Sequence, residues 1–283
     1  MSNRGIIIQA RALSSRCPGK IFRYLPDGSG ITVLEQVIRR VKRVKGAKVI
    51  IVATSCRQED DEVIRLVQNE NVLSFRGSEE HVLSRFYLAA SSCELTDIIR
   101  ITADCPCIDP MIIDELIQNH VRRGMDYTSN TLKRTFPRGL DAEVISFSAL
   151  EKAYKNASED FEQEHVTPYI YRSHPEQFHV MNLEAEGRIN NPSIRVTLDT
   201  EEDYALLCAV YDYLYDEATL FRTADIIDLF EKKPWLSLIN KRINQKSLTS
   251  SIEEEYKEAL DLMERNGLKK ARKFIIEQVG KYA

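Results

Sequence analysis

The chain has 283 residues, of which 39 are basic and 43 acidic, so its formal net charge is −4. A nucleic-acid-binding protein normally carries a basic surplus, and this composition argues against that class. No apolar run reaches the roughly 18 residues that a membrane span needs, and the run after Met1 is too short for a signal peptide. The six cysteines lack C-x-x-C spacing, which argues against a zinc site or a redox dithiol. We therefore expect a soluble cytoplasmic protein with free thiols.

Apolar runs alternate with amphipathic patterns in the first part of the chain, which is typical of βαβ units and a parallel sheet. Strands are expected at residues 6–9, 49–53, 72–75 and 98–101. Helical spacing of apolar residues predicts helices at 33–44, around 63–67, at 81–92 and at 111–121. The last of these follows Asp109-Pro110, a favourable helix start.

From residue 126 onward the periodicity is weaker. Strands are expected at 126–130, 143–146, 178–183 and 194–198, and helices at 147–156, 161–173 and 200–213. The last helix would be capped by Asp199 or Thr200. Residues 242–283 have two apolar stripes separated by Asn266-Gly267, which predicts a helical hairpin that docks on the core or on another subunit.

The segment IIIQARALSSRCPGK, residues 6–20, places a basic loop directly after the first predicted strand. Open α/β folds bind phosphate ligands at this position, and fixed cations can neutralise a polyphosphate there. Arg11, Arg16 and Lys20 are the candidate cations. The loop lacks the glycine spacing of a P-loop and of a dinucleotide-binding turn, so we expect side chains to supply most of the phosphate contacts.

Residues 6–20 also resemble the signature of the cytidylyltransferases that activate acidic sugars, most closely the branch named for spore-coat polysaccharide biosynthesis. That branch is similar to the CMP-3-deoxy-octulosonate and CMP-nonulosonate (acylneuraminate) synthetases. Further family-like segments follow in the expected order: RGSEEHVLSRF (76–86), RITADCPCIDP (100–110), FPRGLDAEV (136–144), EHVTPYIYR (164–172) and VTLDTEEDY (196–204). The resemblance implies a three-layer α/β nucleotidyltransferase fold, like that of nucleotide-diphospho-sugar transferases, with a mixed, mostly parallel sheet.

Two aspartates stand just after predicted strands, Asp104 after 98–101 and Asp199 after 194–198. Carboxylates at strand ends can converge on one hard cation, and magnesium prefers such oxygen ligands. The resemblance implies that both aspartates are metal ligands. Each has an alternative role as a cap, Asp104 of the following turn and Asp199 of the helix from Thr200. Asp203, one helical turn further on, is an additional contender.

Arg76, Gly77 and Ser78 follow the third predicted strand, where the relatives place a loop that meets the nucleotide base. The backbone of Gly77 and Ser78 could read the edge of cytosine, and Arg76 or Arg85 could brace the loop. A plain strand-to-helix turn with Ser78 as the N-cap accounts for the same residues. The choice of cytidine therefore depends on the resemblance.

The acceptor site is expected to include Arg138, Asp141, Glu143, Glu164 and His165. The sequence FPRGLD predicts a turn before a strand, so Asp141 and Glu143 would point to the same face. Carboxylates there would suit sugar hydroxyls, and Arg138 would suit the carboxylate of a keto-acid sugar. Glu164 and His165 could instead form a pair bonded within the protein.

We therefore expect a magnesium-dependent cytidylyltransferase that condenses CTP with an acidic or modified sugar, giving a CMP-sugar and pyrophosphate for surface-glycan synthesis. Arg11, Arg16 and Lys20 would stabilise charge on the leaving pyrophosphate, and magnesium would polarise the α-phosphate. Gln9 and Ala10 complete the expected nucleotide-binding residues. We expect a cytidylyltransferase domain at 1–241, with nucleotide-binding (1–125) and acceptor-binding (126–241) halves, and a helical extension at 242–283. The resemblance implies a homodimer, and the charge and the lack of a long apolar run lead us to expect no binding to nucleic acid or membrane.

Two other functions stay open. One is a sugar-1-phosphate nucleotidyltransferase or an NDP-sugar glycosyltransferase on the same fold. A glycosyltransferase would be expected to carry Asp-x-Asp after the fourth strand, and the sequence there, residues 102–104, is Thr-Ala-Asp. The other is a non-catalytic nucleotide-binding assembly protein, in which the helical extension would be the working part.

Overall fold

The computed structural model describes residues 3–13, 17–243 and 252–279. The chain divides into two compact units, Met1–Ile243 and Asn244–Ala283.

The first unit is built on a seven-stranded sheet of order β3-β2-β1-β4-β6-β5-β7. Its strands are β1 Arg4–Gln9, β2 Val49–Ser55, β3 Leu73–Gly77, β4 Asp97–Thr102, β5 Tyr127–Ser129, β6 Glu143–Ser146 and β7 Val180–Asn182. Strand β1 pairs in parallel with β2 and β4, whereas β6 is antiparallel to both β4 and β5. This mixed, mostly parallel sheet confirms the predicted fold class.

Strand β1 explains why its sequence reads as one apolar run. Ile6, Ile7 and Ile8 are all 0% exposed, because both faces of the sheet are covered. Ile6 and Ile8 point into one hydrophobic core and Ile7 into the other. The sheet is therefore the middle of three layers.

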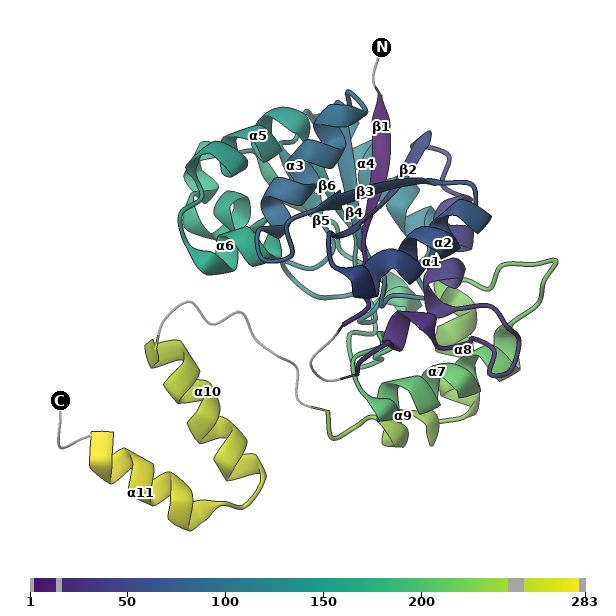
Figure 1. The fold of residues 1–283 in the computed structure, drawn as a ribbon. Coiled ribbons are helices and arrows are strands. Elements are labelled where there is room, and N and C mark those ends of the chain that lie inside the picture. Colours follow the sequence, from purple (N-terminus) through teal and green to yellow (C-terminus); the bar gives the residue numbers. More distant parts are fainter. Residues whose placement is uncertain (1–2, 14–16, 244–251, 280–283) are drawn as a thin grey trace. The chain divides into compact units, whose positions relative to one another are not determined.

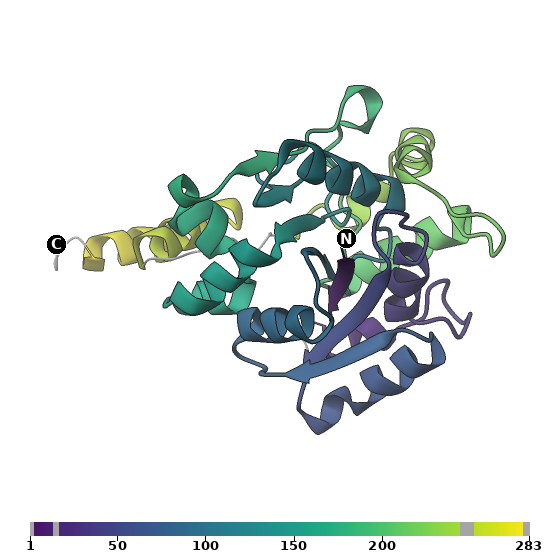
Figure 2. The ribbon, with the colours of Figure 1, turned by 90° about the horizontal axis from the view of Figure 1, so that it is seen from above.

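Helices cover both faces of this sheet (Figures 1 and 2). The core on one face contains residues of α1 Val33–Val41, α2 Asp61–Asn69, α4 Pro110–Arg123, α7 Glu201–Leu214, α8 Thr223–Lys232 and α9 Leu236–Ile239. The core on the other face contains residues of α3 Val82–Ser92 and α5 Phe147–Asn156. Helix α4 begins as predicted, since the Asp109 side chain accepts a hydrogen bond from the Met111 N–H at 3.0 Å and Pro110 follows it.

The helix predicted at 161–173 is wrong as a continuous element. Helix α6 covers Asp160–His165, and a separate π-helical turn covers Tyr169–Ser173. Val166 between them has φ 73° and ψ −52°, and the Thr167 N–H donates to the His165 carbonyl at 2.9 Å. This is a γ-turn, which ends the helix although the apolar spacing continues through it.

The strand predicted at 194–198 is also wrong. Within the described residues this segment belongs to none of the sheet's strands and forms the isolated bridge Arg138↔Arg195. Its apolar alternation instead reflects burial, because Ile194, Val196 and Leu198 all enter the core on the α1 face. The segment consequently lies against the 136–141 turn and leads directly to Asp199.

The second unit contains α10 Ile252–Arg265 and α11 Lys269–Val279, separated at Gly267 with φ 69°. This is the hairpin predicted from the two apolar stripes. Several of its apolar side chains are strongly exposed, including Ile252 (73%) and Phe274 (61%). In the part of the chain that the structure describes, no helix combines the length and apolar character that crossing a bilayer requires.

Candidate active site

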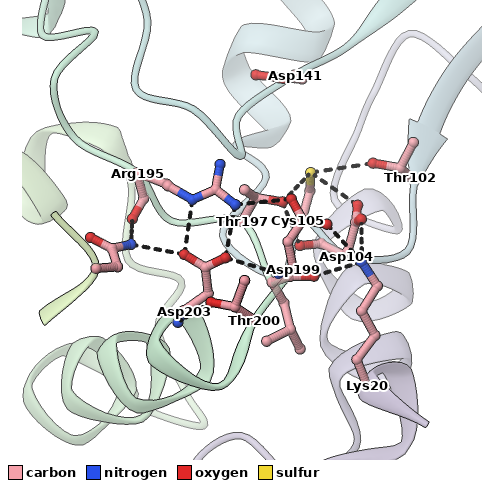
Figure 3. Close-up of polar contacts among 12 residues, drawn as sticks. Lys20, Thr102, Asp104, Cys105, Asp141, Arg195, Thr197, Asp199, Thr200 and Asp203 are labelled. Atoms are coloured by element: carbon pink, nitrogen blue, oxygen red, sulfur yellow. Dashed lines mark hydrogen bonds and ion pairs between the residues drawn. The ribbon is translucent and has the colours of Figure 1, made fainter. Parts of the chain in front are cut away.

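Lys20 lies between two carboxylates that come from distant parts of the sequence (Figure 3). Its Nζ donates hydrogen bonds to Asp104 Oδ2 at 2.7 Å, to Asp199 Oδ1 at 3.0 Å and to the Leu198 carbonyl at 2.6 Å. Asp104 follows β4, and Asp199 precedes α7. The structure thus brings together a predicted phosphate-binding lysine and the two predicted metal ligands.

The environment of this cluster keeps Lys20 and Asp104 charged. Burial alone would lower the pKa of Lys20, but the charges of Asp104 and Asp199 outweigh burial and raise it above 10.5. Burial alone would raise the pKa of Asp104, but Lys20 outweighs that effect and lowers it below 3.8. Lys20 and Asp104 are therefore both ionised at neutral pH.

Asp199 is oriented from behind by Arg195, whose Nη2 donates to Asp199 Oδ2 at 2.9 Å. Arg195 is itself held by Asp203 through bonds of 2.9 and 2.8 Å, and Asn240 donates to the same carboxylate at 2.9 Å. Asp203 is 0% exposed and fully engaged in this network, so it supports Asp199 from behind. Thr200, whose Oγ1 accepts from the Asp203 N–H, caps α7 and leaves the Asp199 carboxylate available for other partners.

The Asp104 loop is fixed by backbone contacts. The Leu198 N–H donates to the Asp104 carbonyl at 2.8 Å, and the Tyr211 hydroxyl donates to the Pro106 carbonyl at 2.6 Å.

The two cysteines of this loop are buried. Burial raises the pKa of the Cys105 thiol well above 9.0, and that of Cys107 to about 12. Both thiols are therefore protonated at neutral pH and are poor nucleophiles.

The basic loop after β1 is held by a residue that the sequence analysis missed. Asp60 Oδ1 accepts from the Ala12 N–H at 2.6 Å, while Oδ2 accepts from the Ser55 N–H at 2.9 Å and its hydroxyl at 2.5 Å. Asp60 is 2% exposed. Its position after β2, at the start of α2, is the signal that could have indicated a loop-positioning role.

The three predicted cations of this loop are placed differently. Lys20 is buried in the carboxylate cluster, whereas Arg11 is exposed and lines a cavity of about 420 Å³. The lining of that cavity includes His81 and Glu164, so the structure brings Glu164 close to Arg11. Arg16 lies outside the described residues.

The loop after β3 is braced by Arg85, one of the two arginines considered for that role. Arg85 Nη1 donates to the Ser78 carbonyl at 2.9 Å, whereas Arg76 Nε donates to the Ser55 carbonyl at 2.9 Å, at the end of β2. Arg85 is 1% exposed, and burial lowers its pKa to about 10. A Cβ at Gly77 would lie 3.1 Å from Arg85 Cγ, so the loop packs closely on this side chain.

The 136–141 turn depends on Gly139. Its φ is 98°, and a Cβ there would lie 2.5 Å from the Val196 carbonyl carbon and 2.6 Å from the Thr197 nitrogen. Glycine therefore allows the turn to lie directly against the segment that carries Asp199. Asp141 in this turn receives two hydrogen bonds from Arg134, at 2.7 and 2.9 Å.

Arg138 differs from its neighbours. Its guanidinium makes no hydrogen bond or ion pair with the residues that the structure describes. Burial lowers its pKa, the nearby charges of Arg134 and Arg195 lower it further, and the carboxylates of Asp141 and Asp199 offset only part of this. Arg138 is thus a half-buried cation, close to other cations, that can accept an anionic ligand.

Glu143 and Gln9 belong to one buried network. Glu143 accepts from Arg100 at 2.5 Å, from the Tyr127 hydroxyl at 2.6 Å and from the Thr167 hydroxyl at 3.0 Å. Arg100 also donates to Gln9 Oε1 at 3.0 Å. The carboxylate predicted to meet the acceptor therefore already has three donors inside the protein.

Glu164 and His165 end α6 immediately before the γ-turn. A β-branched residue with positive φ, such as Val166, is strained, and such strain is concentrated at functional sites. The side chains of Glu164 and His165 are 4.0 Å apart and both partly exposed. The strained turn beside these two side chains favours a functional role for it.

The cluster also suits a divalent cation. Among the described residues, no group of three or more His, Cys, Asp or Glu side chains forms a complete protein metal site. Magnesium often binds one or two carboxylates and takes its remaining ligands from substrate phosphates and water. Asp104 and Asp199 match that donor set.

The fold and this arrangement of loops define a nucleotidyltransferase. A cytidylyltransferase of known structure from Leptospira borgpetersenii superimposes with a TM-score of 0.78 at 31% identity, over 88% of this chain and 100% of that one. CMP:2-keto-3-deoxy-manno-octonic acid synthetase, solved with CTP, shares the fold with a TM-score of 0.57 at 17% identity, over 75% of this chain and 99% of that one.

The sequence comparisons give the family. The cytidylyltransferase family profile matches residues 5–260. The spore coat polysaccharide biosynthesis protein SpsF of Bacillus subtilis is 36% identical over 233 residues, which are 81% of this chain and 94% of that protein. An uncharacterised protein of Methanocaldococcus jannaschii is 37% identical over 241 residues, 85% of this chain and 96% of that one. The chain belongs to the cytidylyltransferase family, which confirms the predicted enzyme class.

Proposed function

We propose that the protein transfers CMP from CTP to an acidic sugar in a magnesium-dependent reaction, releasing pyrophosphate. The observation that carries this proposal is the convergence of Lys20, Asp104 and Asp199 at the carboxyl ends of the central strands. Open α/β folds bind their ligands at this edge, and nucleotidyl transfer needs a cation and a phosphate-binding group at one point.

On the nucleotide side, Arg11, Arg16 and Lys20 would neutralise the triphosphate and stabilise charge on the departing pyrophosphate. Asp104 and Asp199 would hold magnesium, which supplies Lewis-acid polarisation of the α-phosphate when bound. The main chain at Gly77 and Ser78, together with Gln9 and Ala10, would contact the nucleoside. The bracing by Asp60 and Arg85 supports this proposal, because prearranged loops lose little entropy when the substrate binds.

On the acceptor side, Arg138 is the main support for an acidic sugar. A guanidinium without an internal partner can bind a carboxylate bidentately, and burial strengthens that interaction. Asp141 would contact sugar hydroxyls beside it, and Glu164 and His165 would complete the site from the γ-turn. Glu143 would act mainly through its network with Arg100 and Gln9. The name of the Bacillus subtilis relative favours surface-polysaccharide synthesis as the use of the product.

The test is pyrophosphate release by the full chain with each of the four nucleoside triphosphates, against a panel of ulosonic acids and sugar phosphates. The proposal requires release that depends on CTP, on magnesium and on an acceptor with a carboxylate. Pyrophosphate release with sugar 1-phosphates alone would instead indicate a sugar-1-phosphate nucleotidyltransferase.

We also propose that the protein is a homodimer. A monomeric mass by light scattering at micromolar protein concentration would contradict the homodimer.

A further inference from the structure

The hydrogen-bonding capacity of Lys20 is fully used. An ammonium group has three N–H donors, and Lys20 directs them to Asp104, Asp199 and the Leu198 carbonyl. The side chains involved are only 11%, 24% and 15% exposed for Lys20, Asp104 and Asp199. Lys20 therefore cannot donate to a phosphate until it gives up at least one of these bonds.

The carboxylate oxygens that Lys20 occupies are the ones that face each other. Asp199 uses its other oxygen, Oδ2, to accept from Arg195, and Asp104 Oδ1 lies against the Cys105 thiol. A divalent cation held by both aspartates would take the place between them that the Lys20 ammonium fills. Lys20 and the metal would thus compete for the same two carboxylates.

We propose that Lys20 is a built-in counter-ion that holds Asp104 and Asp199 together before substrate arrives and is displaced when metal and nucleotide bind. Without a cation between them the two carboxylates would repel each other. The inference rests on the proposed function, since it takes CTP and a divalent metal as the ligands. Lys20 would then move from the carboxylates to a phosphate, a change that its flexible four-carbon stem allows.

The consequence is a coupling between the two ligands. A metal ion without nucleotide must displace the Lys20 ammonium and leaves that ammonium without a new partner. The metal ion alone therefore binds weakly. CTP offers that partner, so each ligand strengthens the binding of the other by the same factor. Lys20 therefore makes metal binding conditional on nucleotide binding.

The test is the affinity of the full chain for Mn²⁺ alone, without nucleotide, measured by the loss of free Mn²⁺ signal in electron paramagnetic resonance. Lys20→Met removes the competing charge at similar length, and we expect Mn²⁺ to bind at least ten-fold more tightly than to the unaltered chain. Lys20→Arg keeps a cation and should bind Mn²⁺ as weakly as the unaltered chain. Unchanged or weaker binding by Lys20→Met overturns the inference.

Two control variants test whether the gain in Mn²⁺ affinity arises at the carboxylate cluster. Arg23→Met removes a nearby cation that pairs with Glu201, and it should change Mn²⁺ affinity less than three-fold. A gain as large as that of Lys20→Met would indicate general electrostatics and overturn the inference. Adding Asp104→Asn to Lys20→Met should abolish the gain, and a persisting gain would place the metal elsewhere.

A second measurement uses the unaltered chain, so it tests the inference even if Lys20→Met does not fold. The ¹⁵N–¹H signal of the Lys20 ammonium in the unaltered chain should shift when magnesium and a non-hydrolysable CTP analogue are added, and an unshifted signal contradicts displacement. These readouts are separate from catalysis. Failure to release pyrophosphate from CTP with any acceptor removes the proposed function, whereas the Mn²⁺ series decides the role of Lys20.

Discussion

Asp60 Oδ1 accepts a hydrogen bond from the backbone N–H of Ala12 at 2.6 Å, so a buried carboxylate beside α2 holds the basic loop that follows β1. The same carboxylate binds the N–H and hydroxyl of Ser55 at the end of β2. Two adjacent strand ends are thereby fixed by one side chain.

Asp60→Asn should destabilise the protein by about 1–3 kcal/mol, because an amide offers one acceptor oxygen where the carboxylate offers two. Burial alone would raise the pKa of Asp60, but hydrogen bonds from Ser55 and Ala12 outweigh it and lower the pKa below 3.8. A lowered folded-state pKa stabilises the protein above pH 3.8, and that stabilisation is lost as the pH falls through the folded value. Urea unfolding should show the largest difference from the unaltered chain near pH 7.

This difference should shrink below pH 3.8. A difference that stays constant into that range would show that the charge of Asp60 does not contribute. In activity assays the same variant should raise the KM for CTP more than it lowers kcat, because a loosened loop positions the triphosphate less well.

Lys20→Ala should lower the rate of pyrophosphate release by roughly 10²–10³-fold, the usual effect of removing one preorganised charge stabiliser. Arg23→Ala is the matched control, because Arg23 pairs with the exposed Glu201 outside the carboxylate cluster. An unchanged release rate in Lys20→Ala would remove Lys20 from the mechanism.

Asp104→Asn should abolish magnesium-dependent turnover while the protein stays folded. The substitution removes one negative metal ligand and also leaves Lys20 with a weaker partner, so some loss of stability accompanies it. Near-ultraviolet circular dichroism separates loss of the site from loss of the fold. A folded variant with full activity would show that the metal binds elsewhere.

Arg138→Met should raise the KM for an acidic sugar roughly 10- to 100-fold, as expected for losing hydrogen bonds worth about 1.5–3 kcal/mol between charged groups. The KM for CTP should stay nearly constant. Lys133→Met is a suitable control, since Lys133 is an exposed cation close in sequence that pairs with Glu184. Equal effects on both substrates would argue against a carboxylate-binding role.

Comparing Gly139→Ala with Gly187→Ala separates two contributions to the loss of unfolding free energy, backbone conformation and crowding of the new Cβ. Both glycines have positive φ, but a Cβ at Gly187 meets nothing within 4 Å, whereas one at Gly139 lies 2.5 Å from backbone. Gly187→Ala should cost about 1–2 kcal/mol of unfolding free energy from conformation alone. Gly139→Ala should cost a further ~1–3 kcal/mol for crowding, and equal losses in the two variants would contradict the close packing of the turn.

Much of the fold could be predicted because its signals are local. The isoleucines of β1, the Asp109-Pro110 start of α4 and the apolar spacing of α5 all specify their structure within a few residues. The wrong predictions concern apolar segments that are buried in the core without forming the regular strand or helix that their spacing suggests. Ile194, Val196 and Leu198 alternate like a strand, yet they enter the core beside a turn, and Val166 keeps helical spacing while its φ breaks the helix.

The sequence indicated the candidate residues of the site but not their network. Asp104 was chosen because it follows the fourth predicted strand and Lys20 because it lies in a basic loop, whereas Asp199 was chosen partly from a strand at 194–198 that the structure does not contain. That these three bind one another, that Asp203 holds Arg195 behind them, and that Glu143 is taken by Arg100 depend on contacts between distant segments. Asp60 was missed for the same reason, because its burial arises only when β1 and β2 pair.

The most direct test of this account is pyrophosphate release by the unaltered chain and by Asp104→Asn, with CTP or UTP, with and without magnesium, and with an ulosonic acid as acceptor. The account predicts release only from CTP, only with the metal, and only from the unaltered chain. Equal release from UTP, or release by Asp104→Asn at the unaltered rate, would contradict it.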